Sequence, residues 1–266
     1  MSVLPAILIA TAAGGLLSAG IAAVFGQFAR PGWVPVMVSF AIGTLLSAAF
    51  FGVLPEAIEL AGRIETVAGS VLAGVLLFFL LEKLVIWRHC HEETCGTPGT
   101  NAEDGLGHSH GHNHDHGRSG IMITIGDTLH NFVDGVLLAA AFLADYHLGV
   151  VTAVAIIAHE IPQEIGDYLI LLHSGFSRAK ALLLNMLSGA AMVVGGIVGY
   201  FLLDSMKDWI PVVLGLAAAS MIYVAMSDLI PGLHKKTELA ATAQQVLLIA
   251  LGIGGILLVR HLAGSA

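Results

Sequence analysis

Eight apolar segments, each about long enough to cross a lipid bilayer, run through this sequence of 266 residues. A transmembrane helix needs about 20 predominantly apolar residues, and a window of that length finds the candidates. Charged residues make up only 11% of the sequence, whereas soluble proteins carry about 25%. So few charges could not cover a soluble surface, which excludes a cytosolic enzyme, a nucleic-acid-binding protein and a disordered protein. The predicted spans are residues 4–28, 34–55, 66–87, 121–143, 149–172, 180–203, 210–231 and 241–260.

The lysines and arginines between these spans predict how the chain is oriented, because cytosolic loops carry an excess of them. With eight spans, both termini face the same side of the membrane. The opposite side receives eight basic residues, namely Arg30, Lys83, Arg88, Arg118, Arg178, Lys180, Lys235 and Lys236. The side of the termini receives three, which are Arg63, Lys207 and Arg260. We therefore expect a multi-pass protein of the plasma membrane (the inner membrane in a bacterium) with both termini outside.

The one long connection, residues 88–120, is then a cytosolic loop rich in histidine. The two cysteines, Cys90 and Cys95, are too few for a disulfide scaffold, and in the cytosol they are expected as reduced thiols. Alternating histidines suit a flexible segment that wraps metal better than a rigid site. Two interpretations stay open: a metal-capturing loop, and a linker that binds metal incidentally. The candidate ligands are His89, Cys90, His91, His108, His110, His112, His114 and His116.

Ionisable residues gather inside two neighbouring spans, where they are most costly. The fourth span contains His130, Asn131 and Asp134, with Asp127 one turn earlier. The fifth contains the run HEIPQE, which is His159 to Glu164, and Asp167 one turn later. The loop between the spans is short, so they form an antiparallel hairpin. Both clusters lie about 15 residues from the turn, and at 1.5 Å per residue they share one depth near the middle of the bilayer.

Five carboxylates at this depth need positive charge nearby. Each costs about 2.5–3.5 kcal/mol at a helix centre, and neither span offers a lysine or arginine partner. A bound cation fits best, because histidine, asparagine and glutamine are neutral nitrogen and oxygen ligands. Histidine with carboxylate oxygen suits zinc, iron, manganese or cadmium better than an alkali ion. The carboxylates are Asp127, Asp134, Glu160, Glu164 and Asp167.

HNFVDG at 130–135 and HEIPQEIGD at 159–167 resemble the paired signatures of the ZIP (Zrt-, Irt-like protein) family of divalent-metal transporters. The resemblance extends to the eight spans, the outside termini and the histidine-rich loop after the third span. It implies a binuclear metal site at mid-membrane on spans four and five and movement of metal into the cytosol. His130, Asp134, His159 and Gln163 match one metal position, and Asn131, Glu160 and Glu164 match a second.

The resemblance also sets the expected fold. We predict an all-α membrane protein of eight transmembrane helices, a single polytopic domain over residues 1–266. In this ZIP-like bundle, spans 1–3 and 6–8 form an inverted repeat around the 4–5 hairpin. The only internal echo is that spans two and seven both close on a Leu-Pro or Ile-Pro pair. The expected partners are divalent metal ions and the lipid bilayer, with no nucleic acid, and the assembly is left open between a monomer and a homodimer.

One ligand departs from the family pattern. Many relatives with the longer fifth-span motif carry histidine where this chain has Gln163. An amide is a weaker ligand for a transition metal than an imidazole, so the choice among zinc, iron and manganese stays open. The metal is the transported substrate, and no cofactor is expected. Four residues are candidates for an accessory pathway beside the metal ligands: Asp127, Asp167, Asp228 and Glu56.

Two alternatives use the same residues. A metal exporter or a metal-sensing receptor would bind the ion in the same place. A more remote alternative is an intramembrane metallohydrolase, since zinc proteases carry HExxH with both histidines on zinc. Here Gln163 stands at the last position of that motif and Pro162 lies inside it, which fits catalysis badly. The sequence therefore favours a transporter over an enzyme.

Overall fold

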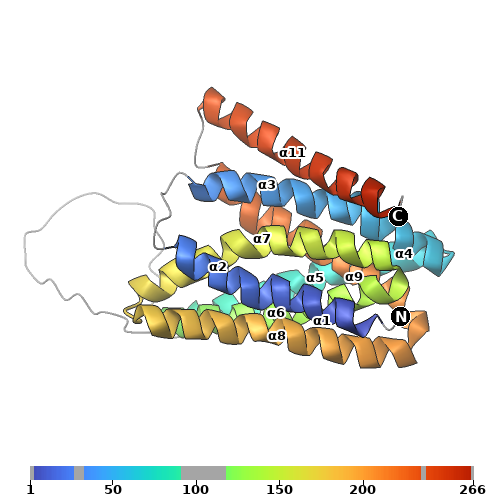
Figure 1. Ribbon diagram of the computed structural model, residues 1–266, viewed down its shortest axis with the longest axis horizontal. Coiled ribbons are helices and arrows are strands. Elements are labelled where there is room, and N and C mark those ends of the chain that lie inside the picture. Colours follow the sequence, from blue (N-terminus) through green and yellow to red (C-terminus); the bar gives the residue numbers. More distant parts are fainter. Residues whose placement is uncertain (1–2, 27–32, 91–117, 235–237, 265–266) are drawn as a thin grey trace, which may run out of the picture.

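The computed structural model describes residues 3–26, 33–90, 118–234 and 238–264, and these residues contain helices and no strand. Eight of the helical segments are long and apolar enough to cross a membrane. They begin and end close to the predicted spans, so the all-helical, eight-span prediction is confirmed. Both chain ends lie at one end of the bundle (Figure 1).

Three of the spans are composite, with a π-helical segment between two α-helical ones. The first span comprises α1 (Leu4–Ala12), η1 (Ala13–Leu17) and α2 (Ser18–Phe25). The second comprises α3 (Trp33–Ser47), η2 (Ala48–Val53) and α4 (Leu54–Ala61). The seventh follows the short 3₁₀ turn η3 (Lys207–Trp209) and comprises α9 (Ile210–Tyr223), η4 (Val224–Leu229) and α10 (Ile230–Leu233).

The other five spans are single α-helices. They are α5 (Ile64–Cys90), α6 (Arg118–Ala144), α7 (Tyr146–His173), α8 (Arg178–Ser205) and α11 (Leu239–Gly264). The helix α7 continues through Pro162. The helices α5 and α11 lie at the periphery, with most of their apolar side chains exposed, as expected for helices that face lipid.

The second span is longer than predicted, because α4 continues through Glu56 to Ala61 instead of ending near residue 55. Pro55 stands in the first turn of α4, directly after η2, and has no N–H to offer the helix. The helix ends at Gly62, whose φ of 62° is the left-handed conformation that glycine adopts readily. The seventh span shows the same arrangement, since Pro231 stands in the first turn of α10, which follows η4 directly. The Leu-Pro and Ile-Pro echo thus coincides with a π-helical segment in both spans, and the inverted repeat as a whole stays a prediction.

Backbone contact between α6 and α8 fixes the helix that carries half of the candidate site. A Cβ atom on Gly195 would lie 2.0 Å from the carbonyl oxygen of Phe132, and one on Gly135 2.0 Å from that of Met192. No side chain fits at either position, so the two helices approach as closely as their backbones permit. This packing leaves the opposite face of α6, with His130 and Asp134, toward α7.

Candidate metal site

A one-residue connection brings the two polar motifs to the same depth. Between α6 and α7 stands Asp145, whose side chain accepts a hydrogen bond from the backbone N–H of Leu148 at 2.8 Å and caps α7. His130 precedes Asp145 by fifteen residues and His159 follows it by fourteen. At 1.5 Å per residue, both imidazoles lie about 21–23 Å from the turn. The hairpin therefore places the two motifs side by side, as expected from the sequence.

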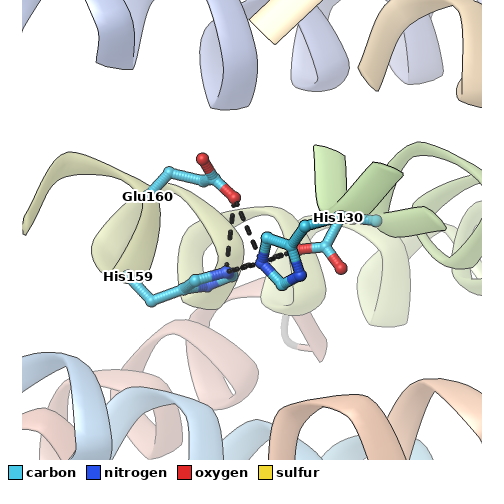
Figure 2. A group of neighbouring side chains, drawn as sticks. His130, His159 and Glu160 are labelled. Carbon is cyan, nitrogen blue, oxygen red and sulfur yellow. Dashed lines mark hydrogen bonds and ion pairs between the residues drawn. The ribbon is translucent and has the colours of Figure 1, made fainter. Parts of the chain in front are cut away.

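Four side chains from these helices form a compact donor cluster. His130 and Asp134 come from α6 and His159 and Glu160 from α7, and one donor atom of each lies within 4.8 Å of all the others. The Nε2 atoms of the histidines are 3.4 Å apart (Figure 2). The His159 Nε2 atom also lies 3.3 Å from a carboxylate oxygen of Asp134 and 3.4 Å from one of Glu160.

These separations suit a small divalent ion. In a tetrahedral zinc site with bonds of about 2.0–2.2 Å, neighbouring ligand atoms lie about 3.3–3.6 Å apart. The three distances around His159 match that spacing, and the two from His130 Nε2 to Glu160 and Asp134 are slightly longer, at 3.7 and 3.8 Å. Two nitrogens and two carboxylate oxygens form a donor set typical of zinc, iron or manganese.

The hydrogen bond of His159 leaves its inner nitrogen available for metal. Its Nδ1 atom lies 3.3 Å from the carbonyl oxygen of Ala155, which can only accept, so Nδ1 carries the proton. The Nε2 atom then presents its lone pair to the cluster whenever the imidazole is neutral. The side chain of His159 is 3% exposed, that of Glu160 is fully buried, and that of His130 is 17% exposed. Water reaches the cluster from the side of His130.

A second group of buried oxygens lies next to the cluster in sequence. Asn131 donates its amide to the carboxylate of Asp127 at 3.1 Å, which leaves its Oδ1 atom without a hydrogen bond among the described residues. Both carboxylate oxygens of Glu160 and both of Glu164 are likewise buried without a hydrogen-bonding partner in that part of the chain. Buried oxygens of this kind are rare unless an ion or water satisfies them. Asn131, Glu160 and Glu164 are the residues that the family resemblance assigns to a second metal.

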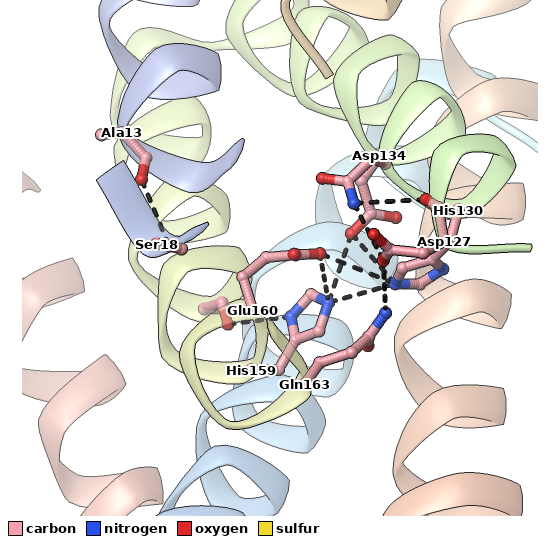
Figure 3. Close-up of polar contacts among 10 residues, drawn as sticks. Ala13, Ser18, Asp127, His130, Asp134, His159, Glu160 and Gln163 are labelled. Carbon is pink, nitrogen blue, oxygen red and sulfur yellow. Dashed lines mark hydrogen bonds and ion pairs between the residues drawn. The ribbon is translucent and has the colours of Figure 1, made fainter. Parts of the chain in front are cut away.

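The resemblance assigns Gln163 to the same metal position as His130, Asp134 and His159. Its hydrogen bond goes to Asp127. Its amide nitrogen donates to Asp127 at 3.3 Å (Figure 3), whereas Glu160 completes the four-donor cluster. Asp127 is thus hydrogen-bonded by both Asn131 and Gln163 and links the two motifs. The amide of Gln163 offers N–H donors that the Asp127 carboxylate accepts.

The cluster has an open cavity on one side and packed apolar residues on the other. The cavity measures about 420 Å³ and reaches from His130, Asp127 and Gln163 past Asp167 toward the end of the bundle where α5 ends and α6 begins. Glu82 and Tyr223, which hydrogen-bond to each other, line its wall. Toward the chain termini, Leu45, Leu137 and Ile156 are at most 5% exposed and close the path. The motifs did not single out these five residues, because Glu82 lies near the end of its span, where a charge is common, and the other four are residue types ordinary for a membrane helix.

The remaining candidates lie apart from the cluster or outside the described residues. Glu56 is half-buried in α4, near the end of the bundle that holds the termini. The backbones of His89, Cys90 and Asp228 are helical, but their side chains are not among those described. The other loop candidates, His91, His108, His110, His112, His114 and His116, lie in the undescribed segment 91–117.

Comparison with known proteins supports the resemblance. The family model described as ZIP zinc transporter matches residues 2–260. "Zinc transporter YKE4" of Saccharomyces cerevisiae is 28% identical over 216 residues, which are 74% of this chain and 60% of the yeast protein. "Zinc transporter ZIP4" of Homo sapiens is 40% identical over 118 residues, 43% of this chain and 18% of the human protein. "Metal cation symporter ZIP14" of Danio rerio is 36% identical over 142 residues, 51% of this chain and 28% of the fish protein.

The chain thus spans less than two thirds of the length of these relatives, while the family model covers nearly all of the chain. That family model, the eight membrane-spanning helices and the buried histidine–carboxylate cluster all indicate the same family. The family is one of transporters, which excludes the alternative of an intramembrane hydrolase. The chain belongs to the ZIP zinc transporter family.

Proposed function

We propose that this protein carries divalent transition-metal ions into the cytosol, zinc first, with iron, manganese and cadmium as further substrates. The observation that carries the proposal is the buried cluster of His130, Asp134, His159 and Glu160, whose donor spacing fits a zinc-sized ion. The names of the similar proteins, two of them zinc transporters, support the choice of metal. The ion is the cargo, and the carboxylates offset the cost of removing its water.

The proposed site is binuclear, with Glu160 between the two ions. Its Oε1 atom lies within 3.4–3.7 Å of both histidines, and its other oxygen is buried without a partner among the described residues. The first ion would be held by His130, Asp134, His159 and Glu160, with Gln163 beside it. The second would be held by Asn131, Glu160 and Glu164, whose unpaired oxygens support this role. Two divalent ions would also balance the carboxylates that no lysine or arginine approaches in these spans.

The proposed direction of transport rests on the open cavity beside the cluster and on the predicted orientation. Asp127, Gln163 and Asp167 line the cavity on the way from His130 to the end of the bundle near the histidine-rich loop. The distribution of lysine and arginine predicts that this end is cytosolic. An ion released from the cluster would leave along these oxygen atoms, and the loop would capture it. Export through the same site is the alternative that a directional assay distinguishes.

Uptake into proteoliposomes tests the proposal. Zn²⁺, Cd²⁺, Fe²⁺ and Mn²⁺ are offered to vesicles of known protein orientation, alone and in competition, with a fluorescent indicator inside. The double variant His130→Ala/His159→Ala should abolish uptake because it removes both nitrogen ligands. The matched control, His147→Ala/His173→Ala, removes two exposed histidines outside the cluster and should transport like the unmodified protein. Equal uptake by the two double variants would refute the site.

Metal content tests the second ion separately. Glu164→Gln removes one of the charges proposed to hold that ion while leaving the four-donor cluster intact. The purified variant should bind about one metal ion fewer than the unmodified protein when both are counted by elemental analysis. Because the loop histidines are the same in both proteins, the difference reports the membrane site alone. Equal metal content would contradict the binuclear arrangement and leave a single-ion site.

A further inference from the structure

A second, much smaller cavity lies against the donor cluster, and His130 and Val224 line both it and the open cavity. It measures about 10 Å³, room for roughly one water-sized atom, and His130, Asp134 and His159 form part of its wall. The rest of the wall is contributed by α3 and α9 and by apolar residues of α6 and α7. The three metal-ligand candidates thus face an enclosed space in which an atom from another helix can approach them.

The chemistry of the opposite wall is apolar except at two neighbouring residues. Of the nine lining residues, four are aliphatic, namely Leu45, Leu137, Ile156 and Val224. Besides these four and the three ligand candidates, the lining contains Ser220 and Met221 of α9, which are 2% and 4% exposed. They provide the only side-chain heteroatoms of this lining that come from outside the α6–α7 hairpin. Methionine in a packed core is usually a filler of irregular space. Here Met221 lines a cavity together with two histidines and an aspartate.

We propose that Met221 is a specificity-determining residue, whose thioether sulfur contacts the transported metal from α9. The inference rests on the proposed function, because it takes the cluster to be the metal site. Three rotatable bonds let the sulfur reach into the cavity without movement of the helix. The four donors on α6 and α7 are nitrogen and oxygen atoms, which serve manganese and iron as well as zinc. A soft sulfur atom shifts this preference toward zinc and cadmium.

The position of Met221 explains why the motifs of spans four and five do not reveal it. It lies on the seventh span, which packs mainly on α5 and the second span, while α6 and α7 carry the donors. Ser220 is the alternative donor on α9, and its hydroxyl oxygen would not favour soft metals. The two residues therefore predict opposite changes in metal preference, which makes the inference testable.

X-ray absorption at the cadmium edge tests the sulfur contact directly. The purified full-length protein carries Cys90→Ser and Cys95→Ser, so that methionine is its only sulfur, and is loaded with Cd²⁺. This parent protein should show a sulfur neighbour of cadmium. The signal should disappear in Met221→Leu, which has a similar volume. It should persist in Ser220→Ala and in Met192→Leu, whose methionine is equally buried but packs on Gly14 in another part of the core.

Binding constants give the second measure. Met221→Leu should weaken Cd²⁺ binding about tenfold, the lower end of what loss of a contact around a metal site costs. Its Mn²⁺ affinity should change by less than about twofold, because sulfur contributes little to a hard ion. Absence of a sulfur neighbour in the parent protein would overturn the inference without reference to any variant. An unchanged ratio of Cd²⁺ to Mn²⁺ affinity in Met221→Leu would overturn it as well.

Failure of the proposed function has a different signature. If His130→Ala/His159→Ala binds Cd²⁺ as tightly as the parent protein, the cluster is not the metal site and the inference falls with it. If the histidine variant loses binding while Met221→Leu matches the parent protein in both affinity and spectrum, the site stands and only the sulfur contact is refuted.

Discussion

The guanidinium group of Arg260 on α11 donates a hydrogen bond to the backbone carbonyl of Phe51 in η2. Phe51 stands four residues before Pro55, which has no N–H to give to that carbonyl. The arginine thus supplies a donor where the helix lacks one, at the junction of a π-helical segment and an α-helix. This hydrogen bond also ties the eighth span to the second. A further hydrogen bond does the same, since Ser47 of the second span donates to the carbonyl of Ile253 in α11.

Arg260→Ala should lower the stability of the protein. The carbonyl of Phe51 then loses a donor, and we expect a loss of about 0.5–1.5 kcal/mol in the free energy of unfolding, the net contribution of a typical hydrogen bond. The melting temperature in detergent, followed by circular dichroism, measures it. Lys207→Ala is the matched control, because Lys207 makes only an exposed ion pair with Asp204 at 3.7 Å, of the kind that contributes little. Equal melting temperatures for the two variants would contradict the role given to Arg260.

Close contact of backbones predicts a second loss of stability. Gly195→Ala places a methyl group 2.0 Å from the carbonyl oxygen of Phe132, so α6 and α8 must move apart. We expect a cost of about 1–3 kcal/mol and weaker metal binding, since α6 carries His130 and Asp134. Gly254→Ala is the control, because a methyl group there meets nothing within 4 Å. That change should be neutral or slightly stabilising in a helix. The melting temperature and the Zn²⁺ affinity are measured for both variants. If Gly195→Ala and Gly254→Ala gave equal values, the contact between α6 and α8 would accommodate the added methyl group, contrary to this prediction.

The metal itself should stabilise the protein. The cluster and the neighbouring Glu164 gather buried carboxylates whose charges only protons, water or an ion can compensate in these spans. Binding at one hundred times the dissociation constant contributes about 2.7 kcal/mol per site. Zn²⁺ should therefore raise the melting temperature, and a chelator should lower it again. In His130→Ala/His159→Ala the Zn²⁺-dependent rise should be lost. A rise of the same size in that variant would assign the stabilisation to another site, with the histidine-rich loop as the first to examine.

Much of this arrangement could be predicted from the sequence, because the bilayer restricts the choices. A run of about 20 apolar residues has to be a helix in lipid, so the spans follow from hydropathy alone. The pairing of His130 with His159 follows from counting residues to a short turn. The π-helical segments and the Arg260 contact could not be predicted, because they depend on which carbonyl a proline leaves free and which distant side chain reaches it. The hydrogen bond from Gln163 to Asp127 was also beyond the motif, because hydrogen-bond partners depend on how the two helices pack in three dimensions.

Replacing Gln163 by histidine should tighten zinc binding. Gln163 donates to Asp127 at 3.3 Å and lines the open cavity beside His130, so a side chain at this position borders the proposed metal path. An imidazole is a stronger zinc ligand than an amide, and we expect the Zn²⁺ dissociation constant to fall about tenfold, with a smaller change for Mn²⁺. Isothermal titration with both metals measures the two effects.

The control for this exchange is Gln163→Leu, which removes the hydrogen bond to Asp127 without adding a ligand. If release of Asp127 were the cause of tighter binding, Gln163→Leu would bind Zn²⁺ more tightly too. We expect it to bind no better than the unmodified protein, because only histidine adds a nitrogen donor. Should Gln163→His and Gln163→Leu have the same Zn²⁺ affinity, residue 163 does not reach the ion, and the first metal is held by His130, Asp134, His159 and Glu160 alone.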